Sequence, residues 1–337
     1  MKVLEVRNVH DALLRGLDLL YHEDRKTESR NGVVYESSTP VTTIYKRPKE
    51  RVIFWKDRDA NPFFHLMESL WMLDGRNDLK FVHQYNKGME NYSDDGVTLH
   101  GAYGWRWCSY FTYNQLEVII DRLKKDPYDR RCVLQMWDPV EDLGRDGKDV
   151  PCNTCIYFKI DYEGRLQMTV SNRSNDIIWG AYGANAVHMS ILQEYMAACI
   201  GVPVGDYYQV SDNFHAYEEK FNELTETFIE KDSFDIESQL RLMKLNPYTS
   251  GEVQSYPMVN VGQHLWKLEL ILFLDRQPFE KIEFTEPFFS EVAVPIQDSW
   301  WLHKQGKTDE AMIEIQKCAA SDWRKACWEW FSRRIEQ

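Results

Sequence analysis

The sequence predicts an α+β fold in which a mixed sheet packs against helices. Segments with helical apolar spacing and β-rich segments share the chain, yet they do not alternate as regular βαβ units. The 337 residues, 43% hydrophobic and 14% aromatic, are also ample for a large packed core.

The first part of the chain contains three predicted helices. Residues 9–23 have helical apolar spacing, and residues 61–75 indicate an amphipathic helix closed by Gly75. The segment "YNQLEVIIDRLKKD" predicts a helix that stops before Pro127, and "CVLQMWDP" predicts the strand that leaves this turn. Residues 28–37 indicate a turn into a strand.

The second part starts with strands and ends with helices. From residue 152 the chain is β-rich, with "CIYFKI", a turn at "DYEG" and "RLQMTVSNRS". Residues 184–201 predict a long, mostly apolar helix, residues 205–217 a strand, and residues 298–334 a helical end. We therefore divide the chain into a main domain, 1–225, and a mainly helical C-terminal extension, 226–337, packed on it.

The charge and the cysteine count exclude several classes of protein. A net charge of −13 disfavours nucleic acid and anionic membranes as partners, although converging arginines would still bind a small anionic substrate. The odd number of cysteines, seven, speaks against a disulfide framework. The N-terminus does not resemble a signal peptide, and no apolar run approaches the roughly 20 residues of a membrane span. We expect a cytoplasmic protein, in the host cytoplasm if phage-encoded.

Cys152 and Cys155 form a C-x-x-C motif that admits several interpretations. It is typical of a redox pair or of half a zinc site, but no second C-x-x-C or H-x-x-H and no βαβ unit accompany it. On a strand, residues three apart point to opposite faces, so we expect at most one active thiol and no metal. Two buried core thiols are the other possibility.

Arginines at turns suggest an anion site. Arg173 and Ser174 in "NRSND" offer a guanidinium fork and a hydroxyl to a phosphate, and a solvated turn is the alternative. Arg30, Arg130 and Arg131 also lie at predicted turns, and each taken singly would be a surface charge.

Three further side chains suit a nucleotide site. His215 and Tyr217, two apart on a strand, share a face on which a ribose hydroxyl could be held. Glu68 lies in the apolar segment "HLMESLWML". It is either a proton-transfer carboxylate with a raised pKa or a glutamate on the helix surface.

Taken together, the motifs resemble the thymidylate synthase and pyrimidine-nucleotide hydroxymethylase family. In order they are "ESRNG", "HLMESLWMLDGRND", "LHGAYGWRW", "DPYDRRCVLQMW", "VPCNT", "NRSNDIIWG", "GAN" and "GDYYQVSDNFHAY". The resemblance covers about residues 10–220 and implies one-carbon transfer from 5,10-methylenetetrahydrofolate to C5 of a pyrimidine deoxynucleotide, without a metal.

The resemblance also implies roles for individual residues. Cys152 matches the nucleophile that adds to C6, which turns C5 into a carbon nucleophile; Cys155 has no role, and we expect it in the core. Glu68 matches the carboxylate that transfers protons through ordered water, and Tyr103 an active-site tyrosine. An arginine beside the sulfur is expected to lower the thiol pKa.

The binding roles follow in the same way. The expected phosphate ligands are Arg30, Arg173 and Ser174, joined by Arg130 and Arg131, which family homodimers contribute across the subunit interface. Asp176 matches the carboxylate that faces the folate pterin, and His215 and Tyr217 match the residues that hold the deoxyribose.

Departures from the family pattern favour hydroxymethylation. Asn153 replaces the histidine that follows the nucleophile in ordinary synthases, the tryptophan expected before "GAYG" is absent, and the chain ends in "SRRIEQ" rather than a short apolar tail. Hydride transfer needs a closed, water-free site, and water would otherwise capture the C5 methylene. If one inserted residue is allowed, Asn185 takes the base-reading position and favours uracil; otherwise Ala184 does.

Three functions therefore remain. The first is a hydroxymethylase, with dUMP favoured over dCMP; the second is a thymidylate synthase or dCMP methylase; the third is a non-catalytic nucleotide-binding relative. The intact set Glu68, Cys152, Arg173 and Asp176 argues against the third.

Overall fold

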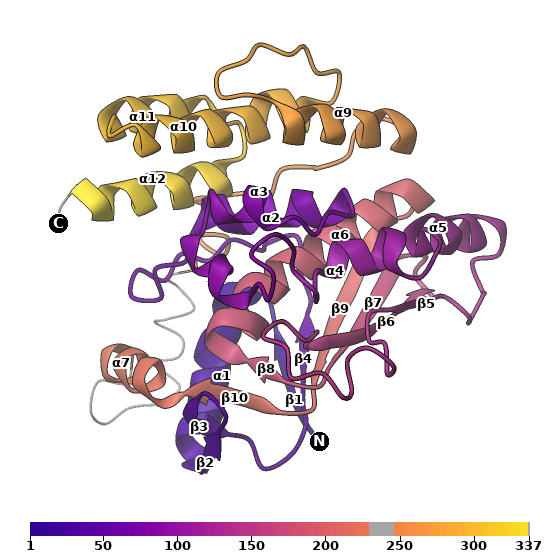
Figure 1. The fold of residues 1–337 in the computed structure, drawn as a ribbon, viewed down its shortest axis with the longest axis vertical. Coiled ribbons are helices and arrows are strands. Elements are labelled where there is room, and N and C mark those ends of the chain that lie inside the picture. Colours follow the sequence, from indigo (N-terminus) through magenta and orange to yellow (C-terminus); the bar gives the residue numbers. More distant parts are fainter. Residues whose placement is uncertain (229–245, 336–337) are drawn as a thin grey trace.

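The computed structural model describes residues 1–228 and 246–335, so part of the predicted extension lies outside the described residues. Two sheets organise the described chain (Figure 1). The larger has the order β1-β4-β9-β7-β6-β5 and the smaller β2-β3-β10-β8. Their bounds are β1 Lys2–Val6, β2 Lys26–Ser29, β3 Gly32–Glu36, β4 Val41–Tyr45, β5 Val133–Gln135, β6 Asn153–Ile160, β7 Leu166–Asn172, β8 Asn175–Asp176, β9 Val204–Ser211 and β10 Phe214–Tyr217.

Both sheets are mixed. In the larger sheet, β1 pairs with β4 and β7 with β9 in parallel, whereas β4–β9, β6–β7 and β5–β6 are antiparallel. In the smaller sheet only β8–β10 is parallel. The predicted α+β class is therefore confirmed.

The helices form layers over the larger sheet. Those of the first 228 residues are α1 Val9–Glu23, α2 Pro62–Leu73, α3 Leu79–His83, α4 Tyr103–Trp105, α5 Gln115–Lys125, α6 Asn185–Ile200 and α7 Glu218–Phe228. The C-terminal helices are α9 Gln263–Asp275, α10 Val294–Lys304, α11 Thr308–Glu314 and α12 Ser321–Ile335. Figure 1 shows these last four as a separate layer beyond α2 and α3. No helix within the described ranges is both long and apolar enough to span a membrane.

The predicted helices are found where the sequence places them. Asn8 and Asn61 cap α1 and α2, each by accepting a backbone N–H of the first turn. Gly75, with φ +76°, follows α2 in the left-handed region that favours glycine. Helix α5 ends before Asp126, and α6 ends at Ile200.

The predicted turn into a strand at residues 28–37 is found, with the turn at Arg30 and Asn31 leading into β3, which pairs with β2 as a hairpin. One strand prediction needs correction. Residues 205–217 split into β9 and β10, which belong to different sheets. The chain leaves the larger sheet at Asp212, and Phe214 then accepts a hydrogen bond from the Ser37 amide.

Helix α2 lies at the centre of the molecule. All of its side chains are buried, because α6 packs on one side and α9, α10 and α12 on the other. The ring of Phe63 contacts Trp300, Trp330 and Phe331 of the C-terminal layer. A glutamate on this helix therefore has no solvent-exposed face to occupy.

Candidate active site

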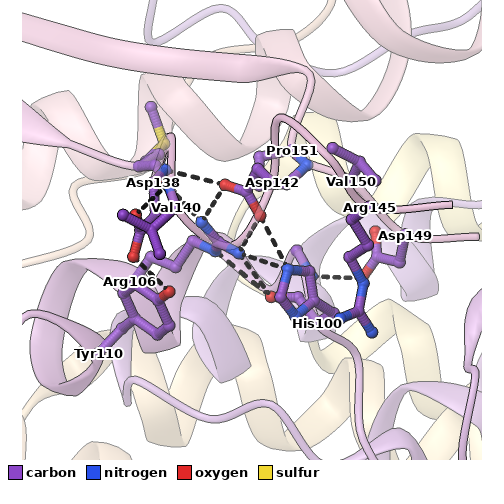
Figure 2. Close-up of polar contacts among 12 residues, drawn as sticks. His100, Arg106, Tyr110, Asp138, Val140, Asp142, Arg145, Asp149, Val150 and Pro151 are labelled. Carbon is purple, nitrogen blue, oxygen red and sulfur yellow. Dashed lines mark hydrogen bonds and ion pairs between the residues drawn. The ribbon is translucent and has the colours of Figure 1, made fainter. Parts of the chain in front are cut away.

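A buried ion-pair network fixes the segment that leads to Cys152. Arg106 and Asp142 have fully buried side chains and form two hydrogen bonds, of 2.7 and 2.9 Å. His100 Nε2 lies 2.8 Å from the same carboxylate, and Arg106 also donates to the carbonyl of Met136 at 2.6 Å (Figure 2). The path of residues 136–142 is thus set from the "LHGAYGWRW" segment.

The same segment holds residues on either side of Cys152. The Gly101 amide donates to Asp149 at 2.7 Å, and the Asn153 amide donates to the Tyr103 hydroxyl at 3.3 Å. Gly104 lets this segment pack closely against the backbone of α2, since a Cβ there would lie 2.0 Å from the backbone oxygen of Met72. Tyr103 is brought to Cys152, and burial raises the pKa of its hydroxyl.

Arg173 lies beside the Cys152 sulfur. Its Nη2 is 4.0 Å from Sγ, and its guanidinium donates to the carbonyls of Val150 and Pro151 at 2.9 and 2.8 Å. Burial raises the pKa of the Cys152 thiol, while Arg173 and, less strongly, Arg30 act to lower it. The expected effect of the arginine is present, but burial outweighs it.

Cys155 does not lie in the core. It is half-buried, pairs with Gln135 and Ser171, and hydrogen-bonds Tyr157, which is 48% exposed. Cys152 precedes β6, and the β6–β7 register shifts between Asn153 and Cys155. The simple strand alternation used to separate the two thiols therefore does not apply, and neither thiol is fully buried.

Glu68 is buried in α2 and faces α6. Its Oε2 lies 3.0 Å from Nε2 of His188, an ion-pair distance at which the ring N–H is not aligned for a hydrogen bond. The ring of His65 stands nearly perpendicular to that of His188, with centroids 6.4 Å apart. Burial keeps the pKa of His65 well below its usual value. The interpretation of Glu68 as a helix-surface residue is wrong.

Amide side chains form a polar layer where β6, β7 and β9 of the larger sheet meet β8 and α6. Asn185 donates to Asn175 at 3.2 Å, and Asn175 donates to Ser211 at 2.9 Å. Asn153 pairs in register with Asn172, is fully buried, and has neither side-chain polar atom hydrogen-bonded within the described residues.

A distortion of the chain brings Asn185 to this layer. Residues 177–184 form a π-helical segment that departs from helical geometry at Tyr182 and Gly183, after which α6 starts at Asn185. Asn185, rather than Ala184, carries the polar side chain there.

The small sheet gathers a second group. Asp176 and His215 are register partners on β8 and β10, and the rings of His215 and Tyr217 are 5.7 Å apart, as expected for residues on one face. One Asp176 oxygen caps the Ile178 and Trp179 amides, while Oδ2 has no hydrogen-bond partner in the described chain. Burial raises the pKa of this carboxyl.

The other predicted phosphate ligands divide into two sets. Arg30 is exposed in the β2–β3 hairpin, whose Asn31 donates to Tyr217 at 3.3 Å, and Ser174 follows Arg173 between β7 and β8. Arg130 and Arg131 instead protrude in the loop between α5 and β5, at the opposite edge of Figure 1 from that hairpin. Arg131 is paired with Asp129 at 3.0 Å. One chain alone does not bring both sets together.

Three residues near these groups were not indicated by the sequence motifs. His188 stands in a mostly apolar helix, and that contrast was the available signal. Arg58, buried, donates to the Ile178 carbonyl at 2.7 Å and lies 4.3 Å from the Trp179 ring; burial lowers its pKa to about 10. Tyr92 is half-exposed, and its partial burial, helped by the charges of Tyr217, Asp149 and Cys152, raises its pKa.

The site thus combines a thiol beside a guanidinium, a buried carboxylate beside a histidine, and a layer of amides. These groups suit nucleophilic addition, proton transfer and recognition of a polar ring. Among residues 1–228 and 246–335, no group of three or more His, Cys, Asp or Glu side chains could hold a metal ion.

Comparisons with known proteins give the chain's relatives. The thymidylate synthase family model matches residues 16–258. The chain is 48% identical to a deoxyuridylate hydroxymethyltransferase of Pseudomonas phage M6, over 99% of this chain and 95% of the relative. It is 43% identical to a protein of that name from Bacillus phage SP01, over 53% of this chain and 49% of the relative, and 34% identical to one from Delftia phage PhiW-14, over 66% and 65%.

Proposed function

Since the chain belongs to the thymidylate synthase family, we propose that it transfers a one-carbon unit from 5,10-methylenetetrahydrofolate to C5 of dUMP and gives the 5-hydroxymethyl nucleotide. The observation that carries this proposal is the 48% identity to a deoxyuridylate hydroxymethyltransferase along nearly the whole of both chains. That similarity includes the C-terminal helices, which the family model does not reach.

Cys152 is the proposed nucleophile. Its thiolate adds to C6 of the uracil, and the electrons that reach C5 make that carbon reactive towards the one-carbon unit. Arg173, 4.0 Å from the sulfur, stabilises the thiolate. The Tyr103 hydroxyl, bonded to the Asn153 amide, fixes the backbone beside the attacking atom.

Proton transfers are assigned to Glu68. A carboxylate buried beside a histidine can take the C5 proton through an ordered water. Asn153 and Asn185 supply amides that both donate and accept hydrogen bonds, and for Asn185 this suits the O4 and N3–H edge of uracil better than the amino edge of cytosine.

The folate, deoxyribose and phosphate ligands are proposed from where their side chains lie around Cys152 and the small sheet. The unpaired oxygen of Asp176 can accept from a pterin N–H, so the donor set fits a folate there. His215 and Tyr217 are proposed to hold the deoxyribose, and Arg30, Arg173 and Ser174 the phosphate.

We also propose a homodimer in which Arg130 and Arg131 complete the phosphate site of the partner subunit. This proposal is supported by the separation, within one chain, of the loop with Arg130 and Arg131 from the β2–β3 hairpin that carries Arg30 (Figure 1). We further propose that residues 1–225 act as the catalytic domain, with residues 226–337 packed on it, and that the enzyme works in the cytoplasm, or the host cytoplasm if phage-encoded.

Product analysis tests the reaction. dUMP and dCMP are each incubated with the enzyme and 5,10-methylenetetrahydrofolate, and the products are identified by mass spectrometry. We expect 5-hydroxymethyl-dUMP with tetrahydrofolate as the second product. A 5-methyl nucleotide with an equal amount of dihydrofolate would instead identify reductive methylation, and turnover of dCMP alone would overturn the base assignment.

A pair of variants tests the nucleophile. We expect Cys152→Ser to abolish turnover, because serine is a far weaker nucleophile at neutral pH, and Cys155→Ser to keep most of it, because Cys155 lies outside the groups around Arg173. Turnover and mass of the trapped nucleotide–protein adduct are the measurements. Equal loss in both variants would restore the view of the two thiols as a functional pair.

A further inference from the structure

We infer that His188 is a positioning residue for Glu68, and that through Glu68 it takes up the proton of the water that captures the one-carbon unit on the nucleotide. This inference rests on the proposed function. It assigns a role in the hydroxymethylation step to a residue in the middle of α6, outside all the sequence motifs that indicated the site.

The geometry singles out this histidine. His188 is 3% exposed and Glu68 is 7% exposed, and Nε2 lies 3.0 Å from Oε2. Nε2 makes no hydrogen bond within the described residues, so it is available to a proton or to a water shared with the carboxylate. Asn185 precedes His188 by one helical turn, so the two side chains lie on the same face of α6.

Asn153, the residue after the nucleophile, cannot take up the proton of the water. Asn153 is completely buried, and its side-chain amide has no hydrogen-bond partner in the described chain. This side chain therefore suits the ordering of a water. An amide does not accept a proton at neutral pH, however. Since Asn153 stands where ordinary synthases have a histidine, the imidazole of His188 beside Glu68 is the base that can share the proton.

After one-carbon transfer, the C5 proton that Glu68 removed has passed to the nitrogen of the departing tetrahydrofolate, so Glu68 is again unprotonated. The nucleotide carries a methylene on C5 and remains bonded to Cys152 through C6. The water oxygen bonds to the methylene carbon, the C5–methylene π electrons move towards O4, and the water proton passes to the Glu68–His188 pair. The electrons then return from O4 to form the C5–C6 double bond, and the C6–sulfur bond breaks to release the Cys152 thiolate.

Other charges surround the pair. His65 on α2 lies perpendicular to His188, and Arg58, which holds its charge against burial, acts on His65 and disfavours its protonation. Asp149, in the segment before Cys152, is repelled electrostatically by Glu68. The charged or titratable groups beside the pair in the described chain thus include Arg58, His65 and Asp149.

The test compares His188→Gln with His10→Gln. His10 is an equally buried histidine, 2% exposed, stacked on Trp55 at 4.1 Å and with neither ring nitrogen hydrogen-bonded in the described chain. We expect His188→Gln to lower kcat about 100-fold, as for a lost proton-transfer group, with little change in KM for dUMP. The acidic limb of its kcat–pH profile should move, whereas His10→Gln should keep both kcat and profile.

A thiol trap locates the affected step. With an added small thiol, His188→Gln should release tritium from C5-tritiated dUMP and accumulate a C5 thioether, detected by mass spectrometry, because the methylene forms but water captures it slowly. A Glu68→Gln, His188→Gln double variant should be no slower than Glu68→Gln alone if the two residues act as a unit.

The outcomes separate the two proposals. Unchanged kcat and an unchanged pH profile in His188→Gln would overturn the role of His188, whatever the wild-type product is. So would a loss of tritium release equal to the loss of product. A 5-methyl product from the wild-type enzyme would overturn the proposed function itself, independently of the variant.

Discussion

At the scale of single residues, two opposing influences act on the pKa of Cys152, the proposed nucleophile. Burial raises the pKa of the Cys152 thiol, because a thiolate loses hydration there, and the guanidinium of Arg173 lowers it. The net direction is upward, so the described state keeps the thiol largely protonated at neutral pH. Any further positive charge or hydrogen-bond donor that a bound substrate supplies would favour the thiolate.

Replacing Arg173 should expose this balance. We expect Arg173→Gln to raise the pKa of Cys152 further and to slow its alkylation by iodoacetamide at neutral pH, because only the thiolate reacts. Peptide mass spectrometry follows Cys152 separately from the other cysteines, across a pH series. Arg173→Lys, which keeps the charge, should remain close to wild type. Identical alkylation profiles for all three proteins would contradict the role of the guanidinium.

At the scale of elements, two segments depend on single buried carboxyls. Asp322 lies in the first turn of α12, and its carboxylate accepts from the Tyr248 hydroxyl at 2.9 Å and from the Trp323 amide at 2.8 Å. Burial nevertheless raises the pKa of Asp322 to about 6. The segment before Cys152 depends in turn on Asp142 and its ion pair with Arg106.

The Asp322 carboxyl predicts a pH-dependent stability. Because its pKa is higher in the folded than in the unfolded chain, its favourable contribution is present below about pH 4 and is lost as the pH rises through about 6. We expect Asp322→Asn to be more stable than wild type above that range, by up to about 3 kcal/mol, with the difference vanishing in acid. Urea midpoints measured against pH test this, and a constant difference at every pH would refute it.

The Arg106–Asp142 pair predicts a large cost when one partner is removed. Arg106→Met leaves a buried carboxylate without its cation, which typically costs about 3–5 kcal/mol. Chemical denaturation should show this loss. Arg106→Met combined with Asp142→Leu should recover part of it.

Glu314→Gln is the matched control for that pair. It removes the exposed ion pair with Lys317 and should cost less than about 1 kcal/mol. A similar loss in Arg106→Met and Glu314→Gln would show that burial of the pair does not matter.

At the scale of the whole molecule, the proposed phosphate ligands do not all meet within one chain. The hairpin with Arg30 and the loop with Arg130 and Arg131 lie at opposite edges of the molecule in Figure 1. The arginine-bearing loop extends into solvent, and Arg130 is exposed. A second copy of the chain is the arrangement that would bring these arginines to a phosphate.

Mixing two inactive variants tests that arrangement. We expect an Arg130→Ala, Arg131→Ala double variant and Cys152→Ser each to have little activity. Mixed dimers should regain turnover, because one of their two sites then contains an intact thiol and intact partner arginines. Subunits are exchanged under mild denaturant, and activity is measured against each variant alone. Lack of recovery in verified mixed dimers, or an active monomer by sedimentation, would contradict the crossing arginines.

The sequence by itself determined the fold class, the helices and the chemical types in the site. Helical apolar spacing predicted α1, α2 and α6, because this signal is local. Ordered motifs were enough to indicate Cys152, Arg173 and Asp176. Only the tertiary structure decided which side chains share an environment. Glu68 is buried because α6 and the C-terminal helices cover α2, and His188 meets it because α6 packs there. The separation of residues 205–217 into two sheets and the partial exposure of Cys155 also depend on long-range pairing, which no local pattern encodes.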